Sequence, residues 1–420
     1  MNTSHDTRRG FGARTLAALT FGLLLAACGG GGGGDAAEPA AAAPAPAPAP
    51  APVPSPPPPA ASALPEGQTV AAGLRHTVFV KPDGTVWSLG DNPDGRLGDG
   101  SITNRLAPVR ATGLAQVRFV SAGDSFTLAL SQSGTAWSWG LNDRGQLGDG
   151  SATNRLAPVP VSGLPANLKS IAAGSYHGLA LDGQGRVWAW GRNVSGPVGD
   201  GSTTDRLSAV MVPGMSNVVR IAAGGFHSAA VKADGTLWMW GRNHLGQLGD
   251  GTTNNSLVPQ AVMGIASIKD VALGCCHTVA VTQSGGVLTW GSNDAGELGD
   301  GTTTLRLRPV AAAGIGNARQ AFAGGARSFA LLSTGTLQGW GENRDGGIGD
   351  GTFASRLTPA TVQSFGSLAS FSAGIAHTLG AASDGKGYAW GGNSNGRLAT
   401  GDTTNRAVPT QTFGEVRAAQ

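Results

Sequence analysis

The sequence predicts an all-β fold, a seven-bladed β-propeller of four-stranded blades. Three observations carry this prediction. A Trp-Gly mark, once Leu-Gly, recurs seven times at steps of 50 or 51 residues, a period typical of propellers and solenoids. The 69 Gly and 24 Pro exclude a helical bundle, while the 10 Trp argue against a disordered chain. Each repeat also contains four short β-like segments, the number found in one propeller blade. The marks place their glycines at Gly90, Gly140, Gly191, Gly241, Gly291, Gly341 and Gly391.

Residues 1–27 are typical of an export signal peptide. Arg8 and Arg9 precede an apolar run over 16–25 that is too short to span a bilayer. The run ends in Leu-Ala-Ala-Cys28, which resembles the lipoprotein box of bacteria, whose cysteine is lipidated and becomes the new N-terminus. We therefore expect an exported protein that Cys28 anchors to the outer membrane or cell surface, or that is periplasmic. The alternative is a plain signal peptide with a chance cysteine, and the two arginines leave open a twin-arginine export route.

Residues 28–63 are rich in Gly, Ala and Pro. An unbroken glycine run over 29–34 is typical of flexible chain, and the Ala/Pro alternation over 39–59 favours extended polyproline II. We expect a disordered tether that holds a folded domain away from a membrane, although a Pro-rich tract can also be a ligand. The propeller is expected over 64–420.

The fourth repeat shows the expected elements. We expect strands over 218–223, 228–231, 236–240 and 257–262. Asp234 and Gly235 form a hairpin turn signal, and Pro259 suits an edge strand. The first segment ends in small residues in nearly every repeat, which favours a place on a crowded central channel. The chain stops about where an eighth inner strand would begin, and 69–72 supplies that strand. We therefore expect the two ends of the propeller to be neighbours.

Three motifs follow one another in the repeats: Ala-Gly-x-x-His, Asp-Gly-x-x-x-x-Trp-Gly-x-Asn and Gly-Gln-Leu-Gly-Asp-Gly. Examples are 223–227 for the first and 246–251 for the third. Together they resemble the regulator of chromosome condensation repeat family over about 64–411, and the resemblance implies a seven-bladed propeller. That family includes an exchange factor for a small GTPase, a plant ultraviolet receptor and a secreted inhibitor of β-lactamases. The resemblance therefore implies a fold far better than a function.

No set of residues predicts catalysis, a cofactor or a metal site. Five histidines share one register, and we interpret them as structural residues that hydrogen-bond neighbouring backbone, since the other two repeats carry Phe126 and Arg327. These histidines are His76, His177, His227, His277 and His377. The aspartates of the Gly-Asp-Gly loops precede arginines, which we interpret as repeated ion pairs rather than calcium or phosphate sites. Cys275 and Cys276 are interpreted as a packed thiol pair, with a redox role as the alternative.

The loops after the third strands are the predicted partner-binding surface, because their residues differ between repeats. The candidates are Asp91, Arg192, Arg242, His244, Glu342 and Arg344. Arginine is enriched at interface hot spots. Propeller loops gathered on one face form a broad platform, which suits a protein or a long polymer better than a small molecule.

The functional hypothesis is a non-catalytic protein–protein interaction module of the cell envelope. A net charge of +3 without a clustered basic face does not indicate nucleic-acid binding. The alternatives are a secreted inhibitor or regulator of an enzyme and, after it, a regulator of a small GTPase similar to a guanine-nucleotide exchange factor. We expect a monomer that contacts a membrane only through its lipid anchor.

Replacing the predicted lipidation site tests the export hypothesis. Cys28→Ser should move the protein from the membrane fraction to the soluble fraction, because a lipid chain adds about 0.8 kcal/mol of membrane affinity per buried methylene group. Cell fractionation with immunodetection measures this. A wild-type protein that is soluble and retains residues 1–27 would refute the anchor.

Overall fold

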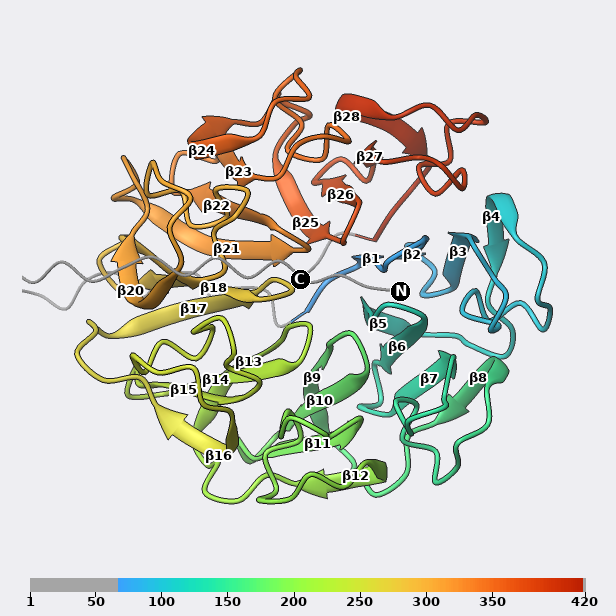
Figure 1. The fold of residues 1–420 in the computed structure, drawn as a ribbon. Helices are drawn as coiled ribbons and strands as arrows, with labels where there is room; N and C mark the ends of the chain where they lie inside the picture. The colour runs from blue at the N-terminus through green and yellow to red at the C-terminus, as the bar shows by residue number, and fades with distance from the viewer. Residues whose placement is uncertain (1–66, 418–420) are drawn as a thin grey trace, which may run out of the picture. The chain divides into compact units, whose positions relative to one another are not determined.

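The computed structural model describes residues 67–417, which form seven four-stranded antiparallel sheets arranged as the blades of a ring (Figure 1). The predicted seven-bladed propeller is confirmed. The expected signal peptide, Cys28 and the whole expected linker lie outside the described residues. Among residues 67–417 no helix is long and apolar enough to cross a membrane.

The strands of each blade follow one another along the chain, from the channel to the rim. Blade 1 contains β1 (Val70–Ala72), β2 (His76–Val80), β3 (Val86–Gly90) and β4 (Arg105–Arg110). Blade 2 contains β5 (Val117–Ala122), β6 (Phe126–Ser131), β7 (Ala136–Gly140) and β8 (Arg155–Pro160). Blade 3 contains β9 (Leu168–Ala173), β10 (His177–Asp182), β11 (Val187–Gly191) and β12 (Arg206–Met211). Blade 4 contains β13 (Val218–Ala223), β14 (His227–Lys232), β15 (Leu237–Gly241) and β16 (Ser256–Ala261).

The remaining three blades repeat this order and complete the ring. Blade 5 contains β17 (Ile268–Leu273), β18 (His277–Thr282), β19 (Val287–Gly291) and β20 (Arg306–Ala311). Blade 6 contains β21 (Ala318–Gly324), β22 (Arg327–Leu332), β23 (Leu337–Gly341) and β24 (Arg356–Thr361). Blade 7 contains β25 (Leu368–Ala373), β26 (His377–Ala382), β27 (Gly387–Gly391) and β28 (Arg406–Phe413). The four strands expected in the fourth repeat agree with blade 4 to within one or two residues.

Glycines fix the end of each blade where two motifs meet. In blade 4, His227 pairs with Gly241 across β14 and β15. Gly241 has a φ of 102°, and a Cβ there would come within 2.6 Å of the Phe226 carbonyl oxygen. Gly224 lies under the histidine, where a Cβ would come within 2.5 Å of the His227 ring. The glycines of the Trp-Gly and Ala-Gly-x-x-His motifs are therefore required because the backbone carbonyl and the histidine ring come too close for any larger residue.

The first strands line a narrow central channel of about 250 Å³. Small side chains such as Ala72, Ala122 and Ala173 face it from successive blades, as the ends of these strands predict. Arg220 and Asp270 also line it, 3.9 Å apart. The channel is too narrow for a macromolecular partner, so the outer faces of the ring are left for binding one.

A tryptophan joins each of blades 2 to 7 to the blade before it. Its indole Nε1–H donates to a backbone carbonyl in the loop after the preceding blade's third strand, at 2.8–3.0 Å. The six side chains are fully buried, so each adds a large apolar contact to the hydrogen bond. They are Trp139, Trp190, Trp240, Trp290, Trp340 and Trp390. Their carbonyl partners belong to Arg96, Gln146, Pro197, Gln247, Glu297 and Gly347.

A hydroxyl group adds a second bond at most of these junctions. Thr127 Oγ1 of blade 2 donates to Arg96 O of blade 1 at 3.1 Å, beside the indole of Trp139. The same hydroxyl lies 3.1 Å from His76 Nε2. Because its single proton goes to the carbonyl, the hydroxyl accepts from the histidine, which fixes the Nε2–H tautomer.

All five in-register histidines form this contact with the next blade. Their Nε2 atoms lie 2.8–3.4 Å from the hydroxyls of Thr127, Ser228, Thr278, Ser328 and Thr77. The sequence analysis expected backbone partners for the histidine rings. The structure adds a hydroxyl of the next blade as a partner of each ring, and in blade 2 this hydroxyl also donates to a backbone carbonyl.

The two repeats without histidine carry matching changes. Phe126 replaces histidine in blade 2, and the facing residue of blade 3 is Gly178, which has no hydroxyl to leave unpaired. Arg327 replaces histidine in blade 6, where a Cβ on Gly347 would lie within 1.6 Å of the guanidinium. Glycine at 347 therefore makes room for the arginine, and each departure from the pattern is accommodated by its neighbour.

The ring closes between blade 7 and blade 1, so the two ends of the propeller are neighbours as expected. Leu89 occupies the tryptophan position of blade 1, and only the Thr77 hydroxyl reaches the Arg397 carbonyl, at 2.8 Å. Phe79 and Phe413 stack with ring centroids 4.7 Å apart. Closure rests on side-chain packing between two complete blades, because blade 1 already has its own inner strand.

Burial of the five histidines makes the stability of the protein depend on pH. Burial lowers the pKa of His227 to about 3 and that of His177 to about 4, against about 6.5 in an unfolded chain. Between these pH values the unfolded chain binds more protons. The free energy of unfolding should therefore fall as the pH falls from about 6.5 towards 4, by up to about 1.4 kcal/mol per pH unit for each histidine.

The arrangement of blade 2 supplies the variant that tests this. His227→Phe with Thr278→Gly should reduce the slope of unfolding free energy against pH by up to about 1.4 kcal/mol per pH unit, because the contribution of one histidine is removed. Denaturant unfolding between pH 7 and pH 4.5 measures the slope. Burial also raises the pKa of Asp124 and Asp270 to about 6, but both carboxyls titrate in either protein and cancel in the comparison. An unchanged slope would contradict the assignment.

Candidate binding surface

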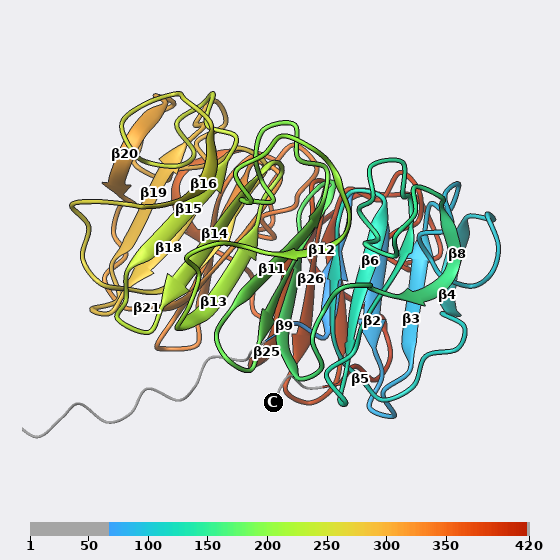
Figure 2. The same ribbon diagram turned by 90° about the horizontal axis from the view of Figure 1, so that it is seen from below.

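One face of the ring carries both kinds of variable segment. The turns between first and second strands and the loops between third and fourth strands meet there, because the pairing of His76 with Gly90 brings the two ends together. Figure 2 shows the strands crossing the thickness of the ring between its two faces. We call the face formed by these turns and loops the loop face.

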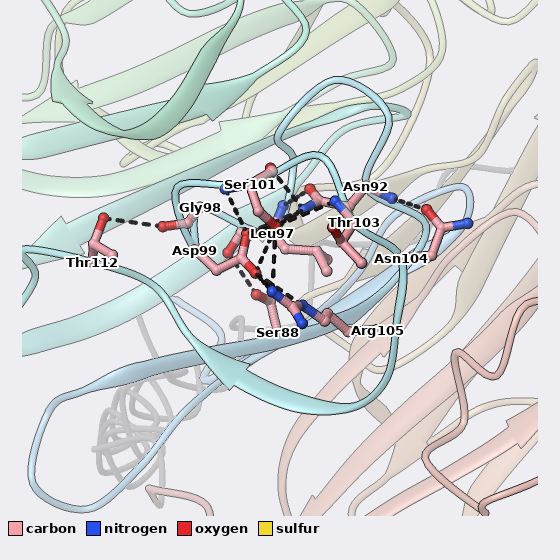
Figure 3. Close-up of polar contacts among 10 residues, drawn as sticks. All are labelled: Ser88, Asn92, Leu97, Gly98, Asp99, Ser101, Thr103, Asn104, Arg105 and Thr112. Carbon is pink, nitrogen blue, oxygen red and sulfur yellow. Dashed lines mark hydrogen bonds and ion pairs between the residues drawn. The ribbon is translucent and has the colours of Figure 1, made fainter.

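A polar network holds each long loop in place, as Figure 3 shows for blade 1. The buried Asn92 side chain accepts from Leu97 N at 3.0 Å and donates to Ser101 O at 2.9 Å and to Asp99 at 3.1 Å. Arg105 donates to the same carboxylate at 3.0 Å, and Ser88 Oγ donates to Leu97 O at 2.6 Å. The fixed Asn, Asp and Arg of the repeat are thus the internal scaffold of the loop.

The ion pair recurs around the ring, which confirms the interpretation of these aspartates and arginines. The pairs are Asp99–Arg105, Asp149–Arg155, Asp200–Arg206, Asp300–Arg306 and Asp350–Arg356, at 2.5–2.8 Å. In blade 7 Thr400 takes the aspartate position, and Arg406 pairs with Asp402 instead, at 2.6 Å. Each carboxylate also accepts from nearby hydroxyl and amide groups, so the aspartates are already satisfied inside the loop.

Two of the predicted contact residues form one continuous stack with two aromatic rings. The guanidinium of Arg192 lies 5.6 Å from the ring centroid of Tyr176 and 5.4 Å from that of Phe226. The guanidinium of Arg242 lies 5.5 Å from the ring centroid of Phe226. The two rings stack with centroids 5.9 Å apart. We call Tyr176, Arg192, Phe226 and Arg242 the arginine–aromatic stack.

The arginine–aromatic stack is half-buried, and its two guanidinium groups are not neutralised by ion pairs within residues 67–417. All four side chains are partly exposed on the loop face. Neither Arg192 nor Arg242 forms an ion pair with a carboxylate of residues 67–417. Stacking on the rings holds the guanidinium planes in place and leaves their N–H groups to bind an external acceptor.

The other predicted residues are distributed around the face. His244 is exposed, and partial burial together with the charge of Arg242 lowers its pKa. Arg344 is exposed and Glu342 half-buried in blade 6, beyond the stack. Asp91 is buried, accepts a hydrogen bond from Asn395 and lies 3.7 Å from Arg75. Its carboxylate is committed to contacts within the ring.

Sequence reasoning missed the aromatic half of the stack. Tyr176 and Phe226 immediately precede the in-register histidines, at a position that is Arg75, Ser125 and Cys276 in other repeats. Variability at that position was the available signal. Two variable positions about 16 residues apart in each repeat face one another only because the strand pairing places them together.

The described part of the chain shows no ligand set for a metal. Within residues 67–417 no three His, Cys, Asp or Glu side chains converge as metal ligands would. The in-register histidines each face a hydroxyl of the next blade rather than one another.

Comparison with known protein families agrees with this architecture. The sequence model of the RCC1-like domain matches residues 24–378, most of the chain. The chain belongs to the RCC1-like domain family. Members share the repeat on which the resemblance in the sequence rested, so that resemblance is confirmed.

Solved structures show the same fold in this family. Human WBSCR16 is 25% identical, with a TM-score of 0.68 over 74% of this chain and 86% of that one. Yeast RCC1 (Prp20), solved bound to Kap60, is 21% identical, with a TM-score of 0.72 over 84% and 89%. Prp20p from Saccharomyces cerevisiae, studied with its binding to Gsp1p and histones, is 22% identical, with a TM-score of 0.71 over 83% and 88%. No curated protein sequence matches the chain.

The scaffold of the loops can be tested in blade 2. Asn142→Ala removes the acceptor for Leu147 N and the donor to Asp149, both in buried or half-buried surroundings. The loss of unfolding free energy should be about 1–3 kcal/mol. Hydrogen exchange should rise over 143–154 and stay unchanged in the equivalent loop of blade 4, which is the internal control. Uniform exchange in both loops would mean that Asn142 does not hold its loop.

Proposed function

We propose that this protein is a non-catalytic protein-interaction module of the cell envelope, and that it binds an acidic surface of its partner through the arginine–aromatic stack. The observation that carries the proposal is the pair of stacked guanidiniums, which have no carboxylate partner among residues 67–417. Arginine and aromatic side chains are enriched where interfaces gain most of their binding energy. An array of this kind across two blades is complementary to carboxylates on a protein.

The shape of the molecule supports a macromolecular partner. The channel has a volume of only about 250 Å³, whereas the loop face extends over seven blades. Small ligands are normally held in deeper and more enclosed sites. Yeast RCC1, which has the same fold, was solved with the protein Kap60 bound to it, and this supports a protein partner for the present chain.

The sequence before the propeller supports the envelope location. The signal-like residues 1–27, Cys28 and the Pro-rich segment would together export the domain and hold it at a distance from a membrane. An inhibitor or regulator of an exported enzyme would use the same stack. The identity of the captured partner distinguishes these two roles, since a hydrolase would indicate the regulator and a structural or transport component the module.

The test is a pull-down from envelope extract followed by affinity measurement with the isolated partner. Arg192→Ala with Arg242→Ala should weaken binding about tenfold or more, because each hot-spot arginine contributes over about 1 kcal/mol. The matched control is Arg110→Ala with Arg319→Ala, which removes the same amount of charge. Both arginines are exposed and lie at the strand ends away from the loop face, Arg110 at the end of β4 and Arg319 near the start of β21. Equal affinity in all three proteins, with folding intact, would move the binding surface away from the stack.

A further inference from the structure

Cys275 and Cys276 lie on the turn between β17 and β18, at the mouth of the channel. Their Sγ atoms are 3.1 Å apart. Cys275 is exposed and Cys276 half-buried, and they are the only cysteines of residues 67–417. The equivalent turns of other blades carry unrelated pairs, such as Ser175 with Tyr176, so the fold itself does not require two thiols here.

The contact makes the two sulfurs unequal. The contact between the two sulfur atoms lowers the pKa of Cys275 to about 7. The same contact and burial raise the pKa of Cys276. The exposed sulfur is thus the better nucleophile at neutral pH, and the half-buried one remains a thiol beside it.

We propose that Cys275 and Cys276 form a thiol–disulfide exchange site that takes an organic disulfide. The Cys275 thiolate attacks one sulfur of the disulfide, whose S–S bond breaks and expels one thiolate. Cys276 then gives its proton to that thiolate and attacks Cys275 Sγ, which breaks the mixed disulfide and expels the second thiolate, and this thiolate takes a proton from solvent. The two protein thiols are oxidised to a bridge, and the organic disulfide is reduced to two thiols.

Chain geometry makes this bridge labile rather than structural. Adjacent Cα atoms are about 3.8 Å apart across a trans peptide, below the roughly 4.4 Å at which unstrained disulfides begin. Strained and exposed disulfides are the easily reduced ones. Structural zinc would need four ligands, and no third His, Cys, Asp or Glu completes a metal site with this pair within residues 67–417.

The cysteine turn is hydrogen-bonded to both neighbouring blades. Cys275 N donates to Gly325 O of blade 6 at 2.9 Å, and Gly225 N of blade 4 donates to Gly274 O at 3.2 Å. The Gly225 turn immediately precedes Phe226, a member of the arginine–aromatic stack. The bridge would therefore form in a turn that is hydrogen-bonded to both neighbouring blades, one of which carries Phe226 of the arginine–aromatic stack.

The experiment uses the full chain with Cys28→Ser, so that the pair holds the only thiols. The reduced protein is incubated with excess glutathione disulfide, quenched with acid, digested and analysed by mass spectrometry. We expect a peptide that carries a 275–276 bridge and no glutathione, and dithiothreitol should restore both thiols. Cys276→Ser should instead keep glutathione on Cys275. Cys275→Ser should react at least about tenfold more slowly, because Cys276 has the smaller thiolate fraction.

The wild-type pair alone decides the outcome, whatever happens to the serine variants. A stable glutathione adduct on Cys275 beside an unreacted Cys276 would overturn the proposal, as would two thiols that stay free. Bridge formation at the same rate in guanidinium-unfolded protein would also overturn it, since the folded turn would then contribute nothing. Partner binding is not part of this measurement, so its result is independent of the proposed function.

Discussion

Each junction between blades depends on one backbone carbonyl. The carbonyl of Arg96, in the loop after β3, accepts both the Trp139 indole and the Thr127 hydroxyl of the next blade. A buried carbonyl without a partner costs about 1–3 kcal/mol, so each of these carbonyls needs at least one donor from the next blade. The Asn92 network holds that loop in the position where its carbonyl meets the following blade. The binding loops are therefore also the links of the ring.

Residues are matched both between blades and within one blade. Phe126 of blade 2 coincides with Gly178 of blade 3, where other blades carry the hydroxyl, whereas Arg327 is accommodated by Gly347 within blade 6. Buried Arg327 donates to Gly374 O of blade 7 at 2.7 Å, so even the exceptional residue joins neighbouring blades. In both exceptional repeats a glycine accompanies the residue that replaces histidine.

Local sequence signals predicted the blades, but they did not predict the side-chain contacts between blades. The 50-residue period, the hairpin glycines and the tryptophan registers were enough for the strand order, because each signal acts within one repeat. The hydroxyl partner of His227 is Thr278, which is 51 residues away, and the sequence around His227 does not indicate this partner. Tyr176 and Phe226 were missed for the same reason, since Arg192 stacks on one ring from its own repeat and one from the next.

Every blade in residues 67–417 is made of four consecutive strands, and none borrows a strand from another. Ring closure between Thr77 and Arg397 follows the same hydroxyl-to-carbonyl rule as the internal junctions. One repeat of the gene therefore encodes one whole blade with both of its contact edges. Duplication or deletion of a repeat by unequal recombination would add or remove an intact structural module, so the number of blades can change over evolution without passing through a broken sheet.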